Sequence, residues 1–448
     1  MKKTKRFLLL ILAVSMLITD TDQVHAADRK KLIPDHIDEF CKKTGCNAVS
    51  VAIVRGDETE FYGDSEGLYQ IGSMTKAFTG LGIQKLINDG VIGEEDNISE
   101  WLPGFSAIYG NETCDITIRQ LLTQTSGYTN NETDYPGASG KMSLMEWTDS
   151  ISGKELNFKP GTEYAYSNVN YNLLGAVIEC VTGETYKEYM EEEILLPLGL
   201  TNTFVYVASE NDQIIRGSRL GYHHCFAYDI PVSVGKIPAG YYYSNAEDMA
   251  RWMRIWMGIA DVPQEYIDLV SSVKERLVAA GDYYSGWELF ENETVGHSGG
   301  TPNYSSRIVF GDKEQTGVCV LTNLNVAAST DGLCNGIYSI VTGGNPDRLP
   351  TDVWIVFDRI FTVLSVAGVI LLGLAAILKR RGILLGLAGA LIIILILLCA
   401  VMPIAFGSGL GEIMIIWAPY SFSGGLVILA VDTLAMIIKL WMMRKHEN

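Results

Sequence analysis

A predicted β-hairpin reads VSVAIVRGDETEFY, from Val49 to Tyr62. Its residues alternate as in strands on the two sides of a Gly56-Asp57 turn. A second hairpin is predicted far along the chain, at Ser305–Asn323. The region between them, about residues 73–270, has mostly helical periodicity with Gly and Pro breaks. We therefore expect an α/β fold in which an antiparallel sheet is assembled from both ends of one domain and a helical lobe is inserted between them.

Residues 1–26 have the pattern of an export signal. A basic head precedes the apolar run Phe7–Ile18, and a small-x-small cleavage site follows at Val24-His25-Ala26. Because the apolar run is short for a membrane span, we favour a cleaved signal over an uncleaved anchor. The domain that follows is then expected on the outer side of the membrane.

Three long apolar runs near the end of the chain predict transmembrane helices. Each is long enough, at about 1.5 Å per residue, to cross a hydrocarbon core of about 30 Å. The basic clusters Lys379–Arg381 and Arg444-Lys445 mark the cytoplasmic side. The expected order is an export signal at 1–26, an exported domain at 27–345, a tether at 346–358, three spans at 359–443 and a cytoplasmic tail at 444–448.

The third apolar run contains two residues that need an interpretation. Trp417 is expected to anchor this run at the membrane interface. Asp432 lies inside the run, and we favour a helix boundary over a contact with a partner helix. Small residues in the first two spans offer packing sites for a homodimer, namely Gly373, Gly386 and Ala390.

The charge of the exported part excludes one class of partner. Residues 27–352 hold 23 basic and 46 acidic side chains, whereas nucleic-acid binding depends on neutralising phosphates. We therefore expect no nucleic acid as a partner. The one compact group of potential metal ligands, His223-His224-Cys225, has no second ligand cluster at suitable spacing, so no metal is expected.

The first candidate for catalytic chemistry is Ser73 with Lys76, in GSMTK ahead of a predicted helix. Side chains three residues apart on a helix share one face. A helix N-terminus stabilises an oxyanion beside the serine, and a desolvated lysine can lose its proton and activate the hydroxyl. The spacing alone is weak evidence, because Ser271 and Lys274 share it and a serine N-cap with a solvated lysine is the ordinary interpretation.

Two further motifs follow in the chain. Tyr166-Ser167-Asn168 contains a tyrosine that can pass a proton to a leaving group and an amide that can hold a substrate carbonyl. His297-Ser298-Gly299-Gly300 precedes the second hairpin, where a strand can pair with a substrate backbone and contribute an oxyanion-hole amide. Each is weak when taken alone. Lys43-Thr44-Gly45 is expected to end a helix rather than to take part in catalysis.

The order of these motifs is more specific than any one of them. Ser-x-x-Lys, Tyr-x-Asn and His-x-Gly, between terminal strands, resemble the motifs of the serine β-lactamase and penicillin-binding family. The likeness is greatest to the class C β-lactamase and D-aminopeptidase-like branch, and it covers about residues 34–340. It implies a β-lactamase/penicillin-binding transpeptidase-like fold.

The resemblance also implies a serine hydrolase that forms an acyl-enzyme and needs no cofactor. In this interpretation Ser73 is the acylated nucleophile, Lys76 its general base and Tyr166 the proton shuttle. Asn168 is expected to hold the substrate amide, and the backbone amides of Ser73 and Gly300 to form the oxyanion hole. The expected substrate-binding strand consists of His297, Ser298, Gly299 and Gly300.

Three spans after such a domain resemble the membrane peptidases that mature colibactin-type and zwittermicin-type prodrugs by removing an N-acyl-D-asparagine cap. Trp417-Ala418-Pro419-Tyr420 and Pro302-Asn303-Tyr304 are similar to that group. Asn303 is then a candidate for reading the D-Asn side chain, since an amide can pair with an amide. Gln70 stands where we expect an acidic residue in that group, a departure that bears on D-Asn specificity. Tyr243 is a further candidate for lining the cleft.

We therefore expect a serine peptidase of the bacterial cytoplasmic membrane, with its catalytic domain on the extracytoplasmic side. It is expected to contact membrane lipid and to cleave the amide bond of an N-acyl-D-amino acid, D-Asn above others. Two alternatives stay open. One is a D,D-peptidase or class C-like β-lactamase with the same catalytic residues. The other is a non-catalytic receptor for β-lactams or peptides, which the short inner segments disfavour because they are too small for a signalling domain.

Overall fold

The computed structural model describes four stretches of the chain, residues 26–129, 142–207, 211–232 and 234–447. The predicted export signal, 1–26, lies outside the described residues except for Ala26.

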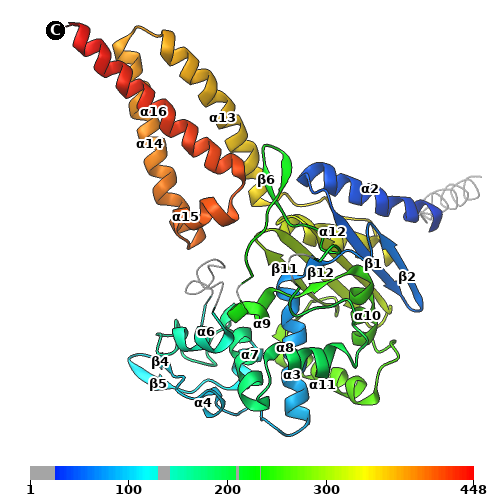
Figure 1. Cartoon of the computed structure of the whole chain (residues 1–448). Coiled ribbons are helices and arrows are strands. Elements are labelled where there is room, and N and C mark those ends of the chain that lie inside the picture. Colours follow the sequence, from blue (N-terminus) through cyan, green and yellow to red (C-terminus); the bar gives the residue numbers. More distant parts are fainter. Residues whose placement is uncertain (1–25, 130–141, 208–210, 233, 448) are drawn as a thin grey trace, which may run out of the picture.

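The central element is a seven-stranded antiparallel sheet with the order β2-β1-β13-β12-β11-β10-β9 (Figure 1). β1, from the beginning of the domain, pairs with β13 from its end, so that Val51 lies opposite Val320. This confirms the expected sheet built from both ends, with β1–β2 and β12–β13 as the two predicted hairpins. The strands are β1 (Val49–Arg55), β2 (Glu58–Tyr62), β9 (Tyr283–Tyr284), β10 (Trp287–Leu289), β11 (Val295–Thr301), β12 (Tyr304–Gly311) and β13 (Thr316–Thr322).

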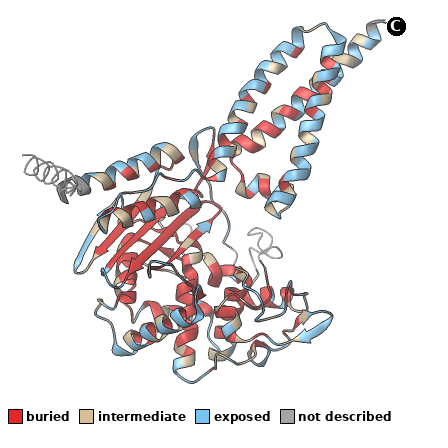
Figure 2. Ribbon diagram, turned by 180° about the vertical axis from the view of Figure 1, so that it is seen from behind, coloured by how far each residue is buried: buried red, intermediate tan, exposed pale blue. Residues whose placement is uncertain are grey.

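Different helices cover the two faces of the sheet, because successive strand residues point to opposite sides. Val51 packs in a core with α2 (Ala26–Thr44) and α12 (Ala327–Val341). Ala52 belongs to the core on the other face, together with α10 (Ala246–Trp256). With both faces covered, the sheet is the most continuous buried part of the molecule, seen in red in Figure 2.

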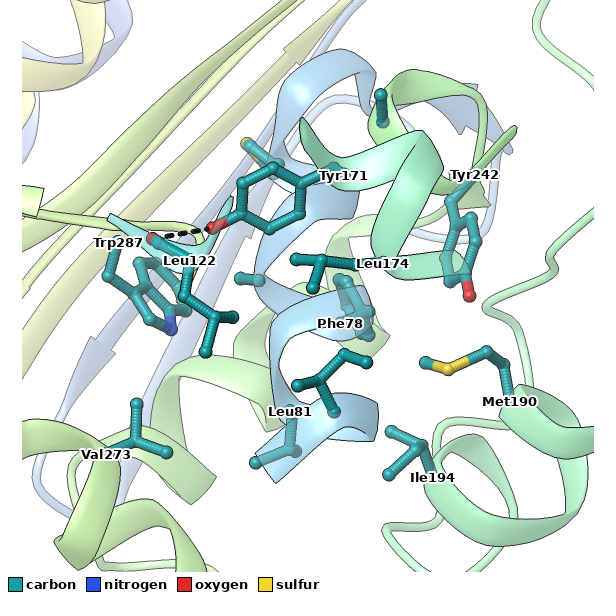
Figure 3. Close-up of a cluster of buried hydrophobic side chains, with 14 of the residues drawn as sticks. Phe78, Leu81, Leu122, Tyr171, Leu174, Met190, Ile194, Tyr242, Val273 and Trp287 are labelled. Carbon is teal, nitrogen blue, oxygen red and sulfur yellow. Dashed lines mark hydrogen bonds between the residues drawn. The ribbon is translucent and has the colours of Figure 1, made fainter. Parts of the chain in front are cut away.

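The helical lobe is built around α3 (Thr75–Asn88). Phe78 stacks on Trp252 with the ring centroids 4.2 Å apart. Figure 3 shows buried side chains packed around α3. Some belong to α3 itself, such as Leu81, and others come from neighbouring helices, such as Leu174. Each fully buried side chain of this size contributes about 1.5–3 kcal/mol to folding. The lobe therefore holds the beginning of α3 in a fixed position against the sheet.

The remaining described elements of this domain range from single turns to α11, which has 17 residues. The helices are η1 (Gly72–Met74), α4 (Ile98–Trp101), α5 (Ile118–Leu122), α6 (Leu144–Ile151), α7 (Asn168–Thr182), α8 (Tyr186–Met190), η3 (Glu191–Leu195), η4 (Val234–Lys236), α9 (Ile237–Gly240) and α11 (Gln264–Ala280). The strands are β3 (Tyr69–Gln70) paired with β8 (Tyr243–Ser244), β4 (Ala107–Tyr109) with β5 (Glu112–Cys114), and β6 (Ser218–Gly221) with β7 (His224–Ala227).

The end of the chain forms three helices long and apolar enough to cross a membrane (Figure 1). They are α13 (Val353–Ile377), α14 (Arg381–Phe406) and α16 (Tyr420–Glu447). Between α14 and α16 the chain forms α15 (Leu410–Glu412) and the wide turn η5 (Ile413–Trp417).

The structure changes the expected boundaries of this segment in three places. α13 begins at Val353, inside the expected tether 346–358, because Asp352 caps the helix by accepting from the Trp354 amide. α16 continues into the expected tail, 444–448. The third apolar run is split, because Pro419 cannot continue a helix, so that η5 ends at Trp417 and α16 begins at Tyr420.

We call the three apolar helices and the turns between them, residues 353–447, the membrane segment. The β6–β7 hairpin contacts this segment through Arg219. This buried guanidinium donates to the carbonyl oxygens of Met414, Ile415 and Ala418, each at 2.6 Å. It also lies over the ring of Tyr420, 4.5 Å from the centroid. These carbonyls end the η5 turn, where a helix has no partners of its own. Arg219 therefore caps η5 from the other domain.

Two buried aspartates occupy the membrane segment itself. Asp358 of α13 accepts from the backbone amides of Tyr222 and His223 and from the hydroxyl of Ser421. It joins the β6–β7 turn to α13 and α16. Asp432 is fully buried in the middle of α16, next to Gly368 of α13. The expectation that Asp432 marks a helix boundary is wrong, because the small Gly368 leaves room for its side chain inside the helix pair.

Candidate active site

Ser73 lies in η1, the single turn ahead of α3. Gly72 before it has φ of +51°, a left-handed conformation that glycine adopts without steric cost. A Cβ atom on Gly72 would lie 2.3 Å from the backbone nitrogen of Gly300. Because Gly72 has no side chain, the backbone next to Ser73 can lie in direct contact with the backbone of β11. Two chain segments far apart in sequence meet at the hydroxyl of Ser73.

Lys76 is fully buried and follows Ser73 by one helical turn. Its Nζ lies 2.9 Å from Ser73 Oγ, 2.6 Å from Asn168 Oδ1 and 2.7 Å from the carbonyl oxygen of Ala239. The oxygens of Asn168 and Ala239 can only accept hydrogen bonds. They therefore take two N–H groups of Lys76 and orient the nitrogen toward the Ser73 hydroxyl.

Asn168 reaches Lys76 because it begins α7. Ser167 is the N-cap of this helix, and its hydroxyl accepts from the Val169 amide. The amide of Ser167 in turn donates to Gln124 Oε1 at 3.0 Å. These bonds fix the first turn of α7 and with it the side chain of Asn168.

Tyr166 lies beside the same lysine, with Lys76 Nζ 4.8 Å from the centre of its ring. Burial raises the pKa of Tyr166 well above the usual range, and the neighbouring Tyr283 adds to the effect. A hydrogen bond with Ser73 acts in the opposite direction and is the smaller influence. Tyr166 therefore keeps its proton at neutral pH while it contacts the nucleophile.

His297 of β11 is buried next to Tyr166, with the ring centroids 6.0 Å apart. Burial lowers the pKa of His297 to about 3, and the charge of Lys76 contributes to the shift. The His297 Nδ1 lies 2.6 Å from the Ser298 carbonyl oxygen, which only accepts, so Nδ1 carries the proton. Nε2 is then free to accept from the Tyr283 hydroxyl at 3.4 Å. The histidine is neutral and has a defined tautomer.

Ser298 and Gly299 fix the position of β11. The hydroxyl of Ser298 donates to Asp331 Oδ1 of α12 at 2.8 Å and accepts from Arg307 at 2.8 Å. A Cβ atom on Gly299 would lie 2.1 Å from the carbonyl oxygen of Ile71. These contacts hold the strand against the segment that precedes Ser73.

Gln70, Tyr243 and Asn303, the other predicted site residues, are buried and bonded to protein groups. Gln70 Nε2 donates to the hydroxyl of Tyr243 at 3.0 Å across the β3–β8 pair. Asn303 Nδ2 donates to the Tyr228 carbonyl oxygen at 2.8 Å, and Asn303 Oδ1 accepts from the Thr301 hydroxyl at 3.2 Å. These side chains brace the walls of the site in this structure.

A cavity of about 220 Å³ opens beside Ser73. Asn168 and Gly300 also line it, so the cavity lies where the three motifs meet. The other lining residues are Asn172, Lys236, Ala239, Gly240, Tyr241, Thr301, Pro302 and Trp417.

Of the residues that line the cavity, only Ser73, Asn168 and Gly300 were predicted as site residues, and two of the others have a clear place in it. Trp417, expected as an interface anchor, belongs to the membrane segment and forms one wall of the cavity. Its Nε1 donates to Glu412 Oε1 at 3.3 Å. Asn172 follows Asn168 by four residues on α7. The sequence could have indicated that Asn172 lies in the site, because residues four apart on a helix share a face and Asn168 was already a candidate.

The described residues include no group of three or more His, Cys, Asp or Glu side chains that could hold a metal ion. His223, one of the compact group singled out in the sequence, lies 3.2 Å from the Asp358 carboxylate with its Nδ1. Asp358 is already engaged in joining the two domains. The geometry beside Ser73 is thus that of a nucleophile, an oriented lysine and a protonated tyrosine.

Known sequences contain close matches to this arrangement. The family model described as Beta-lactamase matches residues 33–336. The protein flp of Staphylococcus aureus (strain MRSA252) is 36% identical over 270 residues, which cover 57% of this chain and 53% of that protein. Penicillin-binding protein 4* of Bacillus subtilis (strain 168) is 28% identical over 272 residues, 55% of this chain and 58% of that protein. The matches thus span about half the length of these curated relatives.

Solved structures share the fold at lower identity. An octameric penicillin-binding protein homologue from Pyrococcus abyssi has a TM-score of 0.61 at 22% identity, over 73% of this chain and 80% of that chain. A class C beta-lactamase in complex with cefoxitin has a TM-score of 0.59 at 15% identity, over 70% of this chain and 99% of that one. At these identities the likeness establishes the shared fold.

Proposed function

Because this chain belongs to the beta-lactamase family, a family of serine hydrolases, we propose that it hydrolyses an amide bond through an acyl-enzyme on Ser73. The observation that carries the proposal is the position of Lys76, whose Nζ lies 2.9 Å from Ser73 Oγ in a buried setting. When Lys76 gives up one proton, its two remaining N–H groups are held by Asn168 and Ala239, and its lone pair is directed at the Ser73 hydroxyl. Lys76 then acts as the general base.

In the acylation step the C–N bond of the substrate is replaced by a bond between its carbonyl carbon and Ser73 Oγ. Ser73 Oγ attacks the carbonyl carbon while its proton passes to Lys76. The C–N bond then breaks, and the leaving amine receives a proton through Tyr166, whose raised pKa keeps the phenol protonated until then. The acyl group remains on Ser73 as an ester. Water subsequently hydrolyses this ester and releases the acid.

The backbone amides of Ser73 and Gly300 are proposed as the oxyanion hole. The close approach of Gly72 to the Gly300 nitrogen supports this role, since it keeps the two segments together before substrate binds. Donors held in advance at a developing negative charge are among the largest contributions to such catalysis. His297 is neutral, so we assign it to positioning Tyr166 and Tyr283 rather than to charge stabilisation.

We propose an N-acyl-D-amino-acid amide as the substrate, with D-Asn as the acyl-donor residue and prodrug maturation as the setting. Three apolar helices after the catalytic domain support this assignment, as does Trp417 in the wall of the cavity. Asn303 is engaged with Tyr228 and Thr301, and Gln70 with Tyr243, so in this proposal they shape the site from behind.

A D,D-peptidase or beta-lactamase activity is the second candidate. The similarity to penicillin-binding protein 4* and the fold shared with class C beta-lactamases favour it. Both candidates use Ser73, Lys76 and Tyr166 in the same roles.

The location we propose is the bacterial cytoplasmic membrane, with residues 27–345 on the extracytoplasmic side. The three apolar helices support a membrane location. The basic cluster Lys379–Arg381 between α13 and α14, and Arg444-Lys445 near the end of α16, support this orientation.

The test is cleavage of an N-acyl-D-asparaginyl anilide by purified full-length protein. The L-isomer and Ser73→Ala are the controls. Release from the D-isomer alone, lost in Ser73→Ala, is the expected result. Labelling of Ser73 by a fluorescent penicillin without anilide release would instead favour the second candidate, and the absence of both signals would refute an acyl-enzyme.

A further inference from the structure

Asn172 is a buried amide with no protein partner in the wall of the catalytic cavity. The side chain is 1% exposed, and within the described stretches of the chain neither its Oδ1 nor its Nδ2 makes a hydrogen bond. Burying an unpaired polar group costs about 1–3 kcal/mol, so native proteins rarely leave both ends of an amide unpaired. Asn172 therefore needs a partner that the folded chain does not supply.

The position of Asn172 restricts what that partner can be. It lies one helical turn beyond Asn168 on α7, and both line the cavity that Ser73 also lines. The Asn168 oxygen is already held by Lys76. A substrate group that enters the cavity next to Ser73 can therefore pair with Asn172.

We infer that Asn172 selects a substrate whose acyl-donor residue carries a primary carboxamide. An amide presents one acceptor and one donor side by side, and a second primary amide offers the complementary pair. This inference rests on the proposed function and deepens it, since it names the residue that reads the side chain.

Lys236 and Thr301 also bring polar groups to the cavity lining, but Asn172 is the lining amide for which the described residues supply no partner. Tyr241, Pro302 and Ala239 present mostly apolar surface, and Trp417 closes the cavity from the membrane segment. Asn303, the amide expected to read the side chain, has both ends engaged by Tyr228 and Thr301. Asn172 combines a place in the cavity wall with an amide that no described residue satisfies.

The experiment compares two substrates of equal shape with purified full-length protein. They are N-acyl-D-asparaginyl anilide and N-acyl-D-leucyl anilide, since leucine matches asparagine in shape without its polar groups. The measured quantity is the ratio of kcat/KM values for the two. Two hydrogen bonds to a buried site predict a preference for the asparaginyl substrate of about tenfold to a hundredfold.

Three variants make the comparison specific. Asn172→Leu is expected to lower the ratio to about one or below. Asn88→Leu, at the exposed end of α3, is the matched control and is expected to keep the wild-type ratio. Trp417→Ala is expected to raise KM for both substrates and to change their ratio little, because it opens the cavity without touching the amide.

Failure of the inference and failure of the proposed function give different results. A wild-type enzyme that cleaves the asparaginyl substrate, with an unchanged ratio in Asn172→Leu, would overturn the role of Asn172 alone. A wild-type enzyme that cleaves neither substrate would overturn the proposed function and this inference with it. If Asn172→Leu does not fold, Asn172→Asp replaces it. This variant keeps the shape and can still accept from the substrate N–H, but it cannot donate to the substrate carbonyl, so it should lose part of the preference.

Discussion

The neutral His297 beside the nucleophile makes the stability of the protein depend on pH. In the unfolded chain a histidine binds a proton below about pH 6.5, whereas in the folded protein burial lowers the pKa of His297 to about 3. Between these values the unfolded state binds more protons, so stability falls as the pH falls. The expected contribution reaches about 1.4 kcal/mol per pH unit. Thermal unfolding between pH 4 and 7 measures it.

The control for this prediction is a histidine on the surface. His297→Gln should flatten the pH dependence of the unfolding temperature, whereas His224→Gln, at an exposed position of β7, should keep the wild-type slope. An equal slope in wild type and His297→Gln would contradict the neutral state of this residue.

Two glycines that meet at the active site are expected to respond differently to an added methyl group. Gly72→Ala places a Cβ in a left-handed conformation and 2.3 Å from the Gly300 nitrogen. We expect a loss of about 1–3 kcal/mol in unfolding free energy and a loss of Ser73 acylation by penicillin. Gly300→Ala has open space around its Cβ and should unfold close to the wild-type temperature. Equal unfolding temperatures of the two variants would show that η1 and β11 do not need the close backbone contact at Gly72.

Residue patterns predicted part of the site and missed another part. Helix spacing predicted the Ser73–Lys76 pair, which is local. That Asn168, 92 positions from Lys76, lies at the same lysine was expected only from the resemblance of the ordered motifs to a known family. Whether an amide is free or engaged depends on contacts between distant segments. Asn303 for this reason could not be recognised as bonded to Tyr228, 75 positions away in the chain.

At the scale of elements, the bond between Arg219 and η5 gives a sharp prediction. Arg219→Ala removes a buried charged donor from the carbonyl oxygens of Met414, Ile415 and Ala418. Hydrogen bonds to charged groups contribute about 1.5–3 kcal/mol. We expect amide hydrogen exchange in residues 413–418 to accelerate by about tenfold or more.

The matched control lies three residues earlier. Arg216 forms an exposed ion pair with Asp229 at 2.6 Å, and such pairs contribute little to stability. Arg216→Ala should leave exchange in 413–418 as in the wild type. Equal acceleration in both variants would show that η5 does not depend on the cap.

The elements themselves were predictable to different degrees. Alternation and turns predicted both hairpins, and Lys43-Thr44-Gly45 ends α2 with Gly45 at φ of +76°, as expected of a helix cap. The split of the third apolar run was not foreseen, because the sequence on both sides of Pro419 is free of charged residues, from Ile413 to Val431. The burial of Asp432 depends on the facing Gly368, which a sequence pattern does not place.

At the scale of the whole molecule, the predicted orientation can be measured. A reporter fused after the last residue should report the cytoplasmic side, because Lys379–Arg381 and Arg444-Lys445 keep to that side. We expect a C-terminal green fluorescent protein to fluoresce and a C-terminal alkaline phosphatase to be inactive. The opposite pair of results would refute the orientation, and a phosphatase fused after α14, in place of α16, serves as the positive control because the end of α14 is expected on the extracytoplasmic side.

The wall that Trp417 contributes links catalysis to the bilayer. Arg219 and Asp358 join the catalytic domain to the apolar helices, so in the orientation that we propose the cavity lined by Trp417 opens close to the lipid. A substrate with a fatty N-acyl chain can remain dissolved in the leaflet while its polar end reaches Ser73. Such a substrate meets the enzyme by diffusing in the plane of the membrane rather than through the surrounding water. Lengthening its acyl chain is expected to change KM, because each added CH₂ group shifts partitioning into the membrane by about 0.8 kcal/mol. The value of kcat is expected to stay the same.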